Sequence, residues 1–152
     1  MRFSARGEYG ILALLELALN DGRRTPLQAR NISRNQRIPL RFLEQVLSAL
    51  KKAGLVESVR GSQGGYNLAR TPEEINLADI LEAIEGPLIA TGCISAGQDP
   101  CWHERELGYC IVKETREAVR SAVLQALNAT TLQELCNRVR QNEQNKTLMY
   151  HI

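Results

Sequence analysis

The chain has 152 residues, of which 43% are hydrophobic and 24% charged, enough to bury the core of one medium-sized domain. Its longest apolar run, residues 11–15, is far too short to cross a bilayer, and the first residues show no apolar segment with a cleavage site. We therefore expect a cytoplasmic protein with no membrane partner. The two histidines and the lack of a nucleophile motif offer no acid–base pair, so we do not expect an enzyme.

Charge is distributed unevenly along the chain, although the net charge is only +2. Residues 1–70 carry 12 Lys and Arg against 5 Asp and Glu, a net charge of +7. Residues 71–152 carry 7 against 12, a net charge of −5. A basic N-terminal half beside an acidic C-terminal half indicates a nucleic-acid-binding domain joined to a second functional part, with chance asymmetry on a solvated surface as the alternative.

Three helices are predicted in the first 54 residues. The first spans residues 4–20, where apolar residues recur at helical spacing before an Asp-Gly pair. A short second helix is predicted at residues 27–33. A turn then leads to Pro39, which suits the first turn of a third helix because it lacks an N–H group. The third helix stops at Gly54, and its inward stripe consists of Leu43, Val46, Leu47 and Leu50.

Two strand-like runs follow at residues 55–60 and 66–70, and the glycine-rich residues 61–65 between them predict a hairpin. A helix, a helix-turn-helix and a hairpin, in this order, are typical of a winged helix-turn-helix domain. We therefore expect a mainly α fold with a small β-hairpin wing over residues 1–86. That domain includes most of a further short helix, which is predicted at residues 76–87.

The C-terminal part is also predicted to be helical. A long helix is expected from about residue 104 to residue 127, because small and β-branched residues form a wide apolar stripe along it. Homodimerisation is the simplest way to cover such a stripe, and packing on the same chain is the alternative. Thr131 and Glu134 match a capping box for a last helix, and the polar tail from Gln141 is expected to fray. We assign residues 87–110 to a cysteine-containing sensor loop and residues 104–141 to the dimerisation helix and C-terminal helix.

The predicted helix-turn-helix offers side chains suited to double-stranded DNA. The first residues of its second helix face base edges in the major groove, where Arg pairs with guanine, Gln with adenine and Glu with cytosine. Basic residues in the turn and at the helix end suit phosphates, and an Arg beside the wing tip suits a narrow minor groove. The predicted DNA-binding residues are Arg34, Arg37, Leu40, Arg41, Phe42, Glu44, Gln45, Lys51, Lys52, Arg60, Gly61, Gly64 and Gly65.

A glycine-rich loop can also hold a nucleotide phosphate. The tip at residues 61–65 lacks the Lys-Ser/Thr ending of a P-loop and does not open a helix, so nucleotide binding is the weaker interpretation. A solvated surface is the alternative for any single charged residue of the DNA-binding set.

Three cysteines are clustered at Cys93, Cys101 and Cys110, with seven and eight residues between them. Cytoplasmic thiols are normally reduced, so metal ligation or redox sensing is favoured over a structural disulfide. Three thiolates need one more ligand to complete an iron–sulfur or zinc site, and His103 lies within the same loop. The absence of a closely spaced cysteine pair disfavours zinc, while reversible disulfide formation and an inert loop remain alternatives. Cys136 lies on an apolar helix face and is interpreted as core packing.

The chain resembles the Rrf-type winged-helix transcription regulators, with their IscR-like, NsrR-like and CymR-like members. The resemblance begins at MRFSARGEYGILALLELALN and includes a late TLQEL, so it covers roughly residues 1–135. Its most specific part is the block L-x-Q-V-L-S-x-L-x-K-A-G-L-V-x-S-x-R-G-x-x-G-G-Y-x-L, which starts at Leu43.

The resemblance implies a homodimer joined by the long helix, a pseudo-palindromic operator and a sensor loop that often holds a [2Fe–2S] or [4Fe–4S] cluster. IscR-like members place a histidine ligand three residues after the last cysteine, where this chain has Lys113. Glu8 matches the carboxylate that NsrR-like members contribute from the partner subunit, so His103 and Glu8 are the two candidate fourth ligands. CymR-like members act without a cluster through a metabolic-enzyme partner, which is the alternative function.

Overall fold

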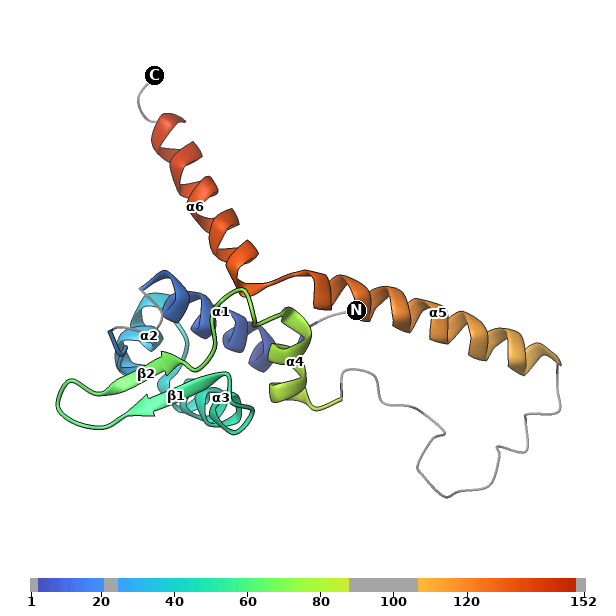
Figure 1. Ribbon diagram of the computed structural model, residues 1–152, viewed down its shortest axis with the longest axis horizontal. Helices are drawn as coiled ribbons and strands as arrows, with labels where there is room; N and C mark the ends of the chain where they lie inside the picture. Colours follow the sequence, from blue (N-terminus) through green and yellow to red (C-terminus); the bar gives the residue numbers. More distant parts are fainter. Residues whose placement is uncertain (1–2, 21–24, 88–106, 150–152) are drawn as a thin grey trace.

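A computed structural model describes residues 3–20, 25–87 and 107–149, and it confirms a mainly helical fold with a two-stranded antiparallel hairpin (Figure 1). The elements in chain order are α1 (Ala5–Leu19), α2 (Ala29–Gln36), α3 (Leu40–Lys52), β1 (Val56–Val59), β2 (Gly65–Leu68), α4 (Leu77–Glu85), α5 (Leu107–Ala129) and α6 (Leu132–Met149). The helix-turn-helix and the wing therefore lie where the sequence predicts them.

Helix α1 is the central element of the N-terminal domain. Ser4 caps its N-terminus, because the Ser4 hydroxyl accepts a hydrogen bond from the Gly7 N–H at 3.1 Å. Ala13, Leu14 and Leu17 are buried on one face, which packs against α2, α3, α4 and β2. The core that results also contains the predicted stripe of α3, namely Leu43, Val46, Leu47 and Leu50, all fully buried.

Helices α1 and α4 approach each other closely at Gly10. A Cβ atom at this position would lie 2.0 Å from Cδ1 of Ile84, which is much closer than side-chain atoms can pack. Ile80 lies on the same side, 3.6 Å from that Cβ position through its Cγ2 atom. The absence of a side chain at Gly10 therefore sets how near α4 can come to the central helix.

The wing is a short hairpin whose register runs from Val56 opposite Leu68 to Val59 opposite Gly65. Val56 and Leu68 are buried and attach the base of the hairpin to the core. The segment before α2 joins the sheet as well, because Leu27 and Tyr66 exchange backbone hydrogen bonds of 3.0 and 2.8 Å. The wing is thus tied both to α3, which it follows, and to the start of the helix-turn-helix.

Helix α4 connects the winged domain to the C-terminal helices. Asn76 caps its N-terminus by accepting from the Asp79 N–H at 2.8 Å. Ala78 and Leu81 form a second small core with Leu127, near the end of α5. The junction between α5 and α6 is fixed by a backbone hydrogen bond from Leu132 to the Ile75 carbonyl, 2.8 Å long.

The start of α6 agrees with the predicted cap, and its end does not agree with the predicted tail. The Thr131 hydroxyl accepts from the Glu134 N–H at 3.1 Å, whereas the Glu134 carboxylate pairs with Arg138 rather than returning to the cap. The helix continues past Gln141 to Met149, so the expectation of a frayed tail was wrong. Residues 141–149 contain no Gly or Pro and are rich in good helix formers, which explains the extension.

None of the helices in the described ranges combines the length and the apolar character needed to span a bilayer.

We predict that Gly10→Ala destabilises the wild-type chain but stabilises an Ile84→Val background. In the wild type, the new methyl group meets Cδ1 of Ile84, and overpacking of this kind costs about 1–3 kcal/mol, more than the roughly 1 kcal/mol that Ala gains over Gly within a helix. Valine lacks Cδ1, so in the Ile84→Val background only the stabilisation that Ala gains over Gly within a helix remains. Denaturant unfolding of the four proteins measures both effects, and an equal effect of Gly10→Ala in the two backgrounds would contradict the close contact.

Candidate nucleic-acid interface

Helix α2 is fixed against α1 by one carboxylate. Asn35 Nδ2 donates to Glu16 Oε1 at 2.6 Å, and Gln36 Nε2 donates to Glu16 Oε2 at 2.5 Å. Both oxygens of the Glu16 side chain are therefore used, on the last two residues of α2. Ile32 adds a fully buried apolar contact on the same helix. The first helix of the helix-turn-helix is thereby held by polar contacts at its C-terminal end and by core packing in its middle.

The turn between α2 and α3 is closed by backbone and side-chain hydrogen bonds. The Ile38 N–H donates to the Ser33 carbonyl at 3.0 Å, and the Ser33 hydroxyl donates back to the Ile38 carbonyl at 2.6 Å. Ile38 is buried, and Pro39 is the N-cap residue of α3, directly before the first turn in which the sequence predicted it. This turn sets the angle at which α3 leaves α2.

The outer face of α3 carries most of the predicted base-reading residues. Leu43 and Val46 point into the core, and the residues between them are exposed. Phe42 is 49% exposed. Leu40 is half-buried at the first turn, so only part of it is available to a partner. The exposed predicted residues of this face are Arg41, Phe42, Glu44, Gln45, Lys51 and Lys52.

Lys51 has a structural contact that the sequence did not indicate. Its Nζ atom donates to the Ser58 hydroxyl on β1 at 2.5 Å, which joins the end of α3 to the wing. Lys52, the next residue, is exposed. The predicted phosphate contact of Lys51 stays a prediction, and in the free protein this side chain links the two elements that the motif brings to DNA.

The glycines of the wing tip are required by the backbone itself. A Cβ atom at Gly64 would lie 2.3 Å from the Val59 carbonyl oxygen, and one at Gly65 would lie 2.4 Å from the Leu27 carbonyl oxygen. The tight turn of the hairpin explains Gly64, and the close pairing with the segment before α2 explains Gly65, both without reference to DNA. Arg60 and Gly61 are exposed at the tip, and their approach to a minor groove stays a prediction.

Arg30 is a basic residue of this region that the sequence-based set omits. Arg30, Arg34, Arg37 and Arg41 follow one another at intervals of four, three and four residues, and all four are exposed. Within the described ranges, none of their guanidinium groups forms an ion pair with a carboxylate. The spacing was visible in the sequence, but it becomes meaningful only when α2 and α3 are known to adjoin. Unneutralised arginines on adjoining elements favour a polyanionic partner.

The cysteine-containing segment is described only at its end. Cys93, Cys101 and His103 lie outside the described residues, as does most of the predicted sensor loop. Cys110 belongs to the first turn of α5, and Lys113 to the next turn. In the parts of the chain that the structure describes, no group of three or more potential metal ligands occurs.

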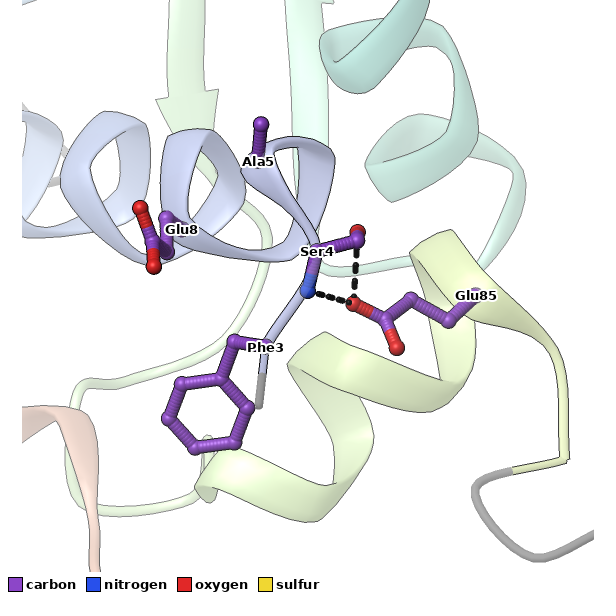
Figure 2. Close-up of a pocket in the computed structure, with 5 residues that line it drawn as sticks. All are labelled: Phe3, Ser4, Ala5, Glu8 and Glu85. Carbon is purple, nitrogen blue, oxygen red and sulfur yellow. Dashed lines mark hydrogen bonds between the residues drawn. The ribbon is translucent and has the colours of Figure 1, made fainter. Parts of the chain in front are cut away.

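Glu8, the other candidate ligand, lies on the exposed side of α1. It lines an open pocket of about 410 Å³ with Phe3, Ser4, Ala5 and Glu85. Figure 2 shows the Glu8 carboxylate directed away from Glu85. Among the described residues, no hydrogen bond or ion pair to the Glu8 carboxylate is present, so this side chain is available to a partner.

Glu85 joins the end of α4 to the start of α1. Its Oε1 atom accepts from the Ser4 N–H at 3.1 Å and from the Ser4 hydroxyl at 2.7 Å (Figure 2). Glu85 is the last residue of α4, and the chain continues from there into the cysteine-containing segment. This contact links residues 81 positions apart, and no local sequence pattern indicates it.

Cys136 is buried in α6, with 1% of its surface exposed, so its predicted role in core packing is confirmed. Desolvation raises the pKa of the Cys136 thiol above its usual range. A buried, protonated thiol is a poor metal ligand and a poor nucleophile, so Cys136 is not a candidate ligand.

The chain matches a family model described as Rrf2, iron-dependent transcriptional regulator, over residues 3–138. It is 34% identical to the HTH-type transcriptional regulator CymR of Bacillus subtilis, over 90% of this chain and 91% of that protein. It is also 34% identical to the HTH-type transcriptional regulator IscR of Pectobacterium carotovorum, over 90% of this chain and 80% of that protein. The family match therefore includes the winged domain, α5 and the first part of α6.

Two solved structures share the arrangement of the elements. The structure of CymR, the global cysteine regulator of B. subtilis, superposes with a TM-score of 0.74 at 30% identity, over 91% of this chain and 98% of that chain. The structure of T. potens IscR superposes with a TM-score of 0.71 at 32% identity, over 91% of this chain and 88% of that chain.

We predict that Glu16→Ala weakens both the fold and DNA binding. The change leaves the amides of Asn35 and Gln36 without their charged acceptor, which should lower the free energy of unfolding by about 1–3 kcal/mol. Because α2 sets the position of α3, affinity for a DNA duplex should fall as well. Denaturant unfolding and fluorescence anisotropy measure the two effects. Glu82→Ala, which removes an exposed carboxylate of α4, is the matched control, and equal effects of the two changes would contradict the proposed bracing role.

Proposed function

The chain belongs to the Rrf2 family of transcriptional regulators, and we propose that it is a homodimer whose operator binding is controlled by an iron–sulfur cluster held by Cys93, Cys101 and Cys110. The family consists of non-enzymatic regulators, and DNA is the partner that a winged helix-turn-helix of this family implies. The observation that carries the DNA-binding part is the outer face of α3. There, Arg41, Glu44 and Gln45 are exposed directly after the turn, in the position from which such helices read a major groove.

Dimerisation is supported by the uncovered face of α5. This helix has 23 residues, and among the side chains that the structure describes, those packed against the second small core are Val123 and Leu127, in its C-terminal part. The rest projects away from the domain (Figure 1). Ile111 is 58% exposed and Val119 is 61% exposed, although both are apolar. A second copy of the same helix covers such a stripe in the simplest symmetric way.

The donor set suits an iron–sulfur cluster. Thiolates are the usual protein ligands of these clusters, and three of the four cysteines are close together in the sequence. The fourth ligand is His103 from the same segment or Glu8 from α1. Glu8 is exposed and directed away from its own domain's α4, as a carboxylate that completes a site on a partner subunit must be. When bound, the cluster supplies redox and ligand-exchange chemistry that the side chains lack.

The two ends of α1 offer a route from the cluster to the DNA-binding elements. At one end, Ser4 is bound by Glu85, two residues before the segment that leads to the cysteines. At the other end, Glu16 holds Asn35 and Gln36 of α2. We infer that a displacement of the cysteine segment shifts α1, and that α1 shifts the helix-turn-helix. Through such a shift, the state of the cluster changes the affinity of the protein for its operator.

The second candidate is a regulator without a cluster that acts through a partner enzyme or through reversible thiol oxidation. The similarity to CymR favours it, since the B. subtilis protein is described as the global cysteine regulator. A zinc site in the same loop is the third chemical form of the sensor. All three alternatives keep the winged domain and its DNA-binding face, and they differ in what the cysteine segment holds.

We predict that protein purified without oxygen absorbs visible light and contains iron and acid-labile sulfide. Cys93→Ser, Cys101→Ser and Cys110→Ser should each abolish the absorption, and Cys136→Ser should preserve it because that thiol is buried in α6. Glu8→Ala and His103→Ala assign the fourth ligand, because only the ligating residue alters the spectrum when removed. A colourless anaerobic preparation, with or without bound zinc, would overturn the cluster.

We predict that Val119→Glu converts the dimer into monomers, because two charges would meet in the apolar contact between the α5 helices. Ser121→Glu is the matched control: it introduces the same charge about 200° further round the helix, away from that contact. Sedimentation equilibrium distinguishes the two masses. A wild-type monomer, or a Val119→Glu protein that dimerises as strongly as Ser121→Glu, would show that α5 does not form the interface.

A further inference from the structure

Arg37 has a backbone conformation that arginine rarely adopts. Its φ and ψ angles are 54° and 37°, and among the described residues it is the only one other than glycine with positive φ. The L side chain makes this left-handed region unfavourable, whereas glycine enters it freely. The position that follows a helix in this way is therefore usually glycine, and sometimes asparagine.

The turn around Arg37 explains why the conformation persists. The Ile38 N–H donates to the Ser33 carbonyl at 3.0 Å and the Arg37 N–H lies 3.4 Å from the Arg34 carbonyl, the pattern that closes a helix with a left-handed residue. Ile38 and Ile32 are both buried, so core packing holds the chain on either side of the turn. The fold thus imposes the conformation, and the sequence places an unfavourable residue in it.

The Arg37 side chain contributes nothing visible to the fold that offsets this cost. It is exposed, and in the described parts of the chain its guanidinium forms neither a hydrogen bond nor an ion pair. It lies between Arg34, in the last turn of α2, and Arg41, in the first turns of α3. In a helix-turn-helix, the first helix crosses the phosphate backbone and the second enters the groove, so the turn between them lies beside the phosphates.

We propose that Arg37 is a phosphate-anchoring residue whose left-handed backbone is retained for DNA binding at the expense of stability. The inference rests on the proposed DNA-binding function and adds to it a positioning role for this turn. The exposed Arg37 side chain belongs to the corner between α2 and α3, and the chain has exposed Arg34 before this corner and exposed Arg41 after it. Because a phosphate contact carries no sequence information, Arg37 strengthens binding to every duplex equally.

A rival explanation is that Arg37 stabilises α2 through the helix dipole, since a positive charge is favourable near a helix C-terminus. This explanation predicts that removing the charge destabilises the protein and leaves DNA binding unaffected. The two effects are separable, because Arg37→Gln removes the charge and keeps the unfavourable backbone. Arg37→Gly removes the charge and relieves the backbone as well.

The experiment compares Arg37→Gly, Arg37→Gln and Arg37→Lys with the wild-type chain, using thermal unfolding and DNA binding over a range of salt concentrations. The DNA probes are a mixed-sequence duplex and a duplex selected by the wild-type protein from a random pool. Arg140→Gln on α6 is the matched control, because it removes the same charge from an exposed site on another element.

We expect Arg37→Gly to unfold at a temperature about 2–4 °C above that of Arg37→Gln. Both substitutions should lower the affinity for the two duplexes by the same factor. The slope of log affinity against log salt should fall in magnitude by about 0.9 for each phosphate that is no longer neutralised, or about 1.8 per dimer. Arg37→Lys should keep most of the slope, and Arg140→Gln all of it. Equal unfolding temperatures for Arg37→Gly and Arg37→Gln would overturn the stability cost.

An unchanged slope in Arg37→Gln, with normal DNA binding by the wild type, would overturn the phosphate contact and leave the proposed function intact. A weakening confined to the selected duplex would overturn it also, because it would indicate base reading. Failure of the wild-type chain to bind either duplex would overturn the proposed function and this inference together.

Discussion

Helix α1 packs against α2, α3, α4, α6 and β2, and the positions of these elements depend on that contact. Its buried face, with Ala13, Leu14 and Leu17, supplies the apolar surface on which the helix-turn-helix rests. On the same buried face, Gly10 lets α4 approach to a distance that any side chain would prevent. A single helix therefore fixes the DNA-binding elements relative to α4, the helix that precedes the cysteine segment. The burial of apolar surface along α1 is the main contribution to the stability of this arrangement.

Polar contacts at the two ends of α1 connect it to the end of α4 and to the end of α2. Core packing alone fixes distances between helices, whereas Ser4 with Glu85 and Glu16 with Asn35 and Gln36 fix particular ends of particular elements. These contacts are partly exposed, so each is weaker than the core and more easily altered by a change at its partner. Strong packing in the middle of α1 and weaker polar contacts at its ends are consistent with the control of DNA binding that we propose.

Much of the fold could be predicted from the sequence, because it depends on local patterns. The apolar stripe of α3, the glycine-rich hairpin tip and the Thr131 cap all act within a few residues, and Cys136 was correctly placed in the core. Side-chain contacts between different elements were not predictable, whether the residues are 81 positions apart, as in the Glu85 hydrogen bond to the Ser4 hydroxyl, or seven, as in the Lys51 bond to Ser58. The Leu27 pairing that requires Gly65 also depends on the assembled fold. The left-handed conformation of Arg37 could not be predicted either, because the residue that ends a helix in this conformation is usually glycine.

If the cysteine segment controls the DNA-binding face, removal of the cluster must change the affinity for the operator. Operator affinity of the anaerobic protein should be measured before and after the cluster is removed by chelation, at one salt concentration, with Cys93→Ser as the cluster-free control. The account predicts a change of about 5- to 150-fold, the range of an ordinary coupling between two sites, and no change in Cys93→Ser. Equal affinity of the two wild-type forms would contradict it.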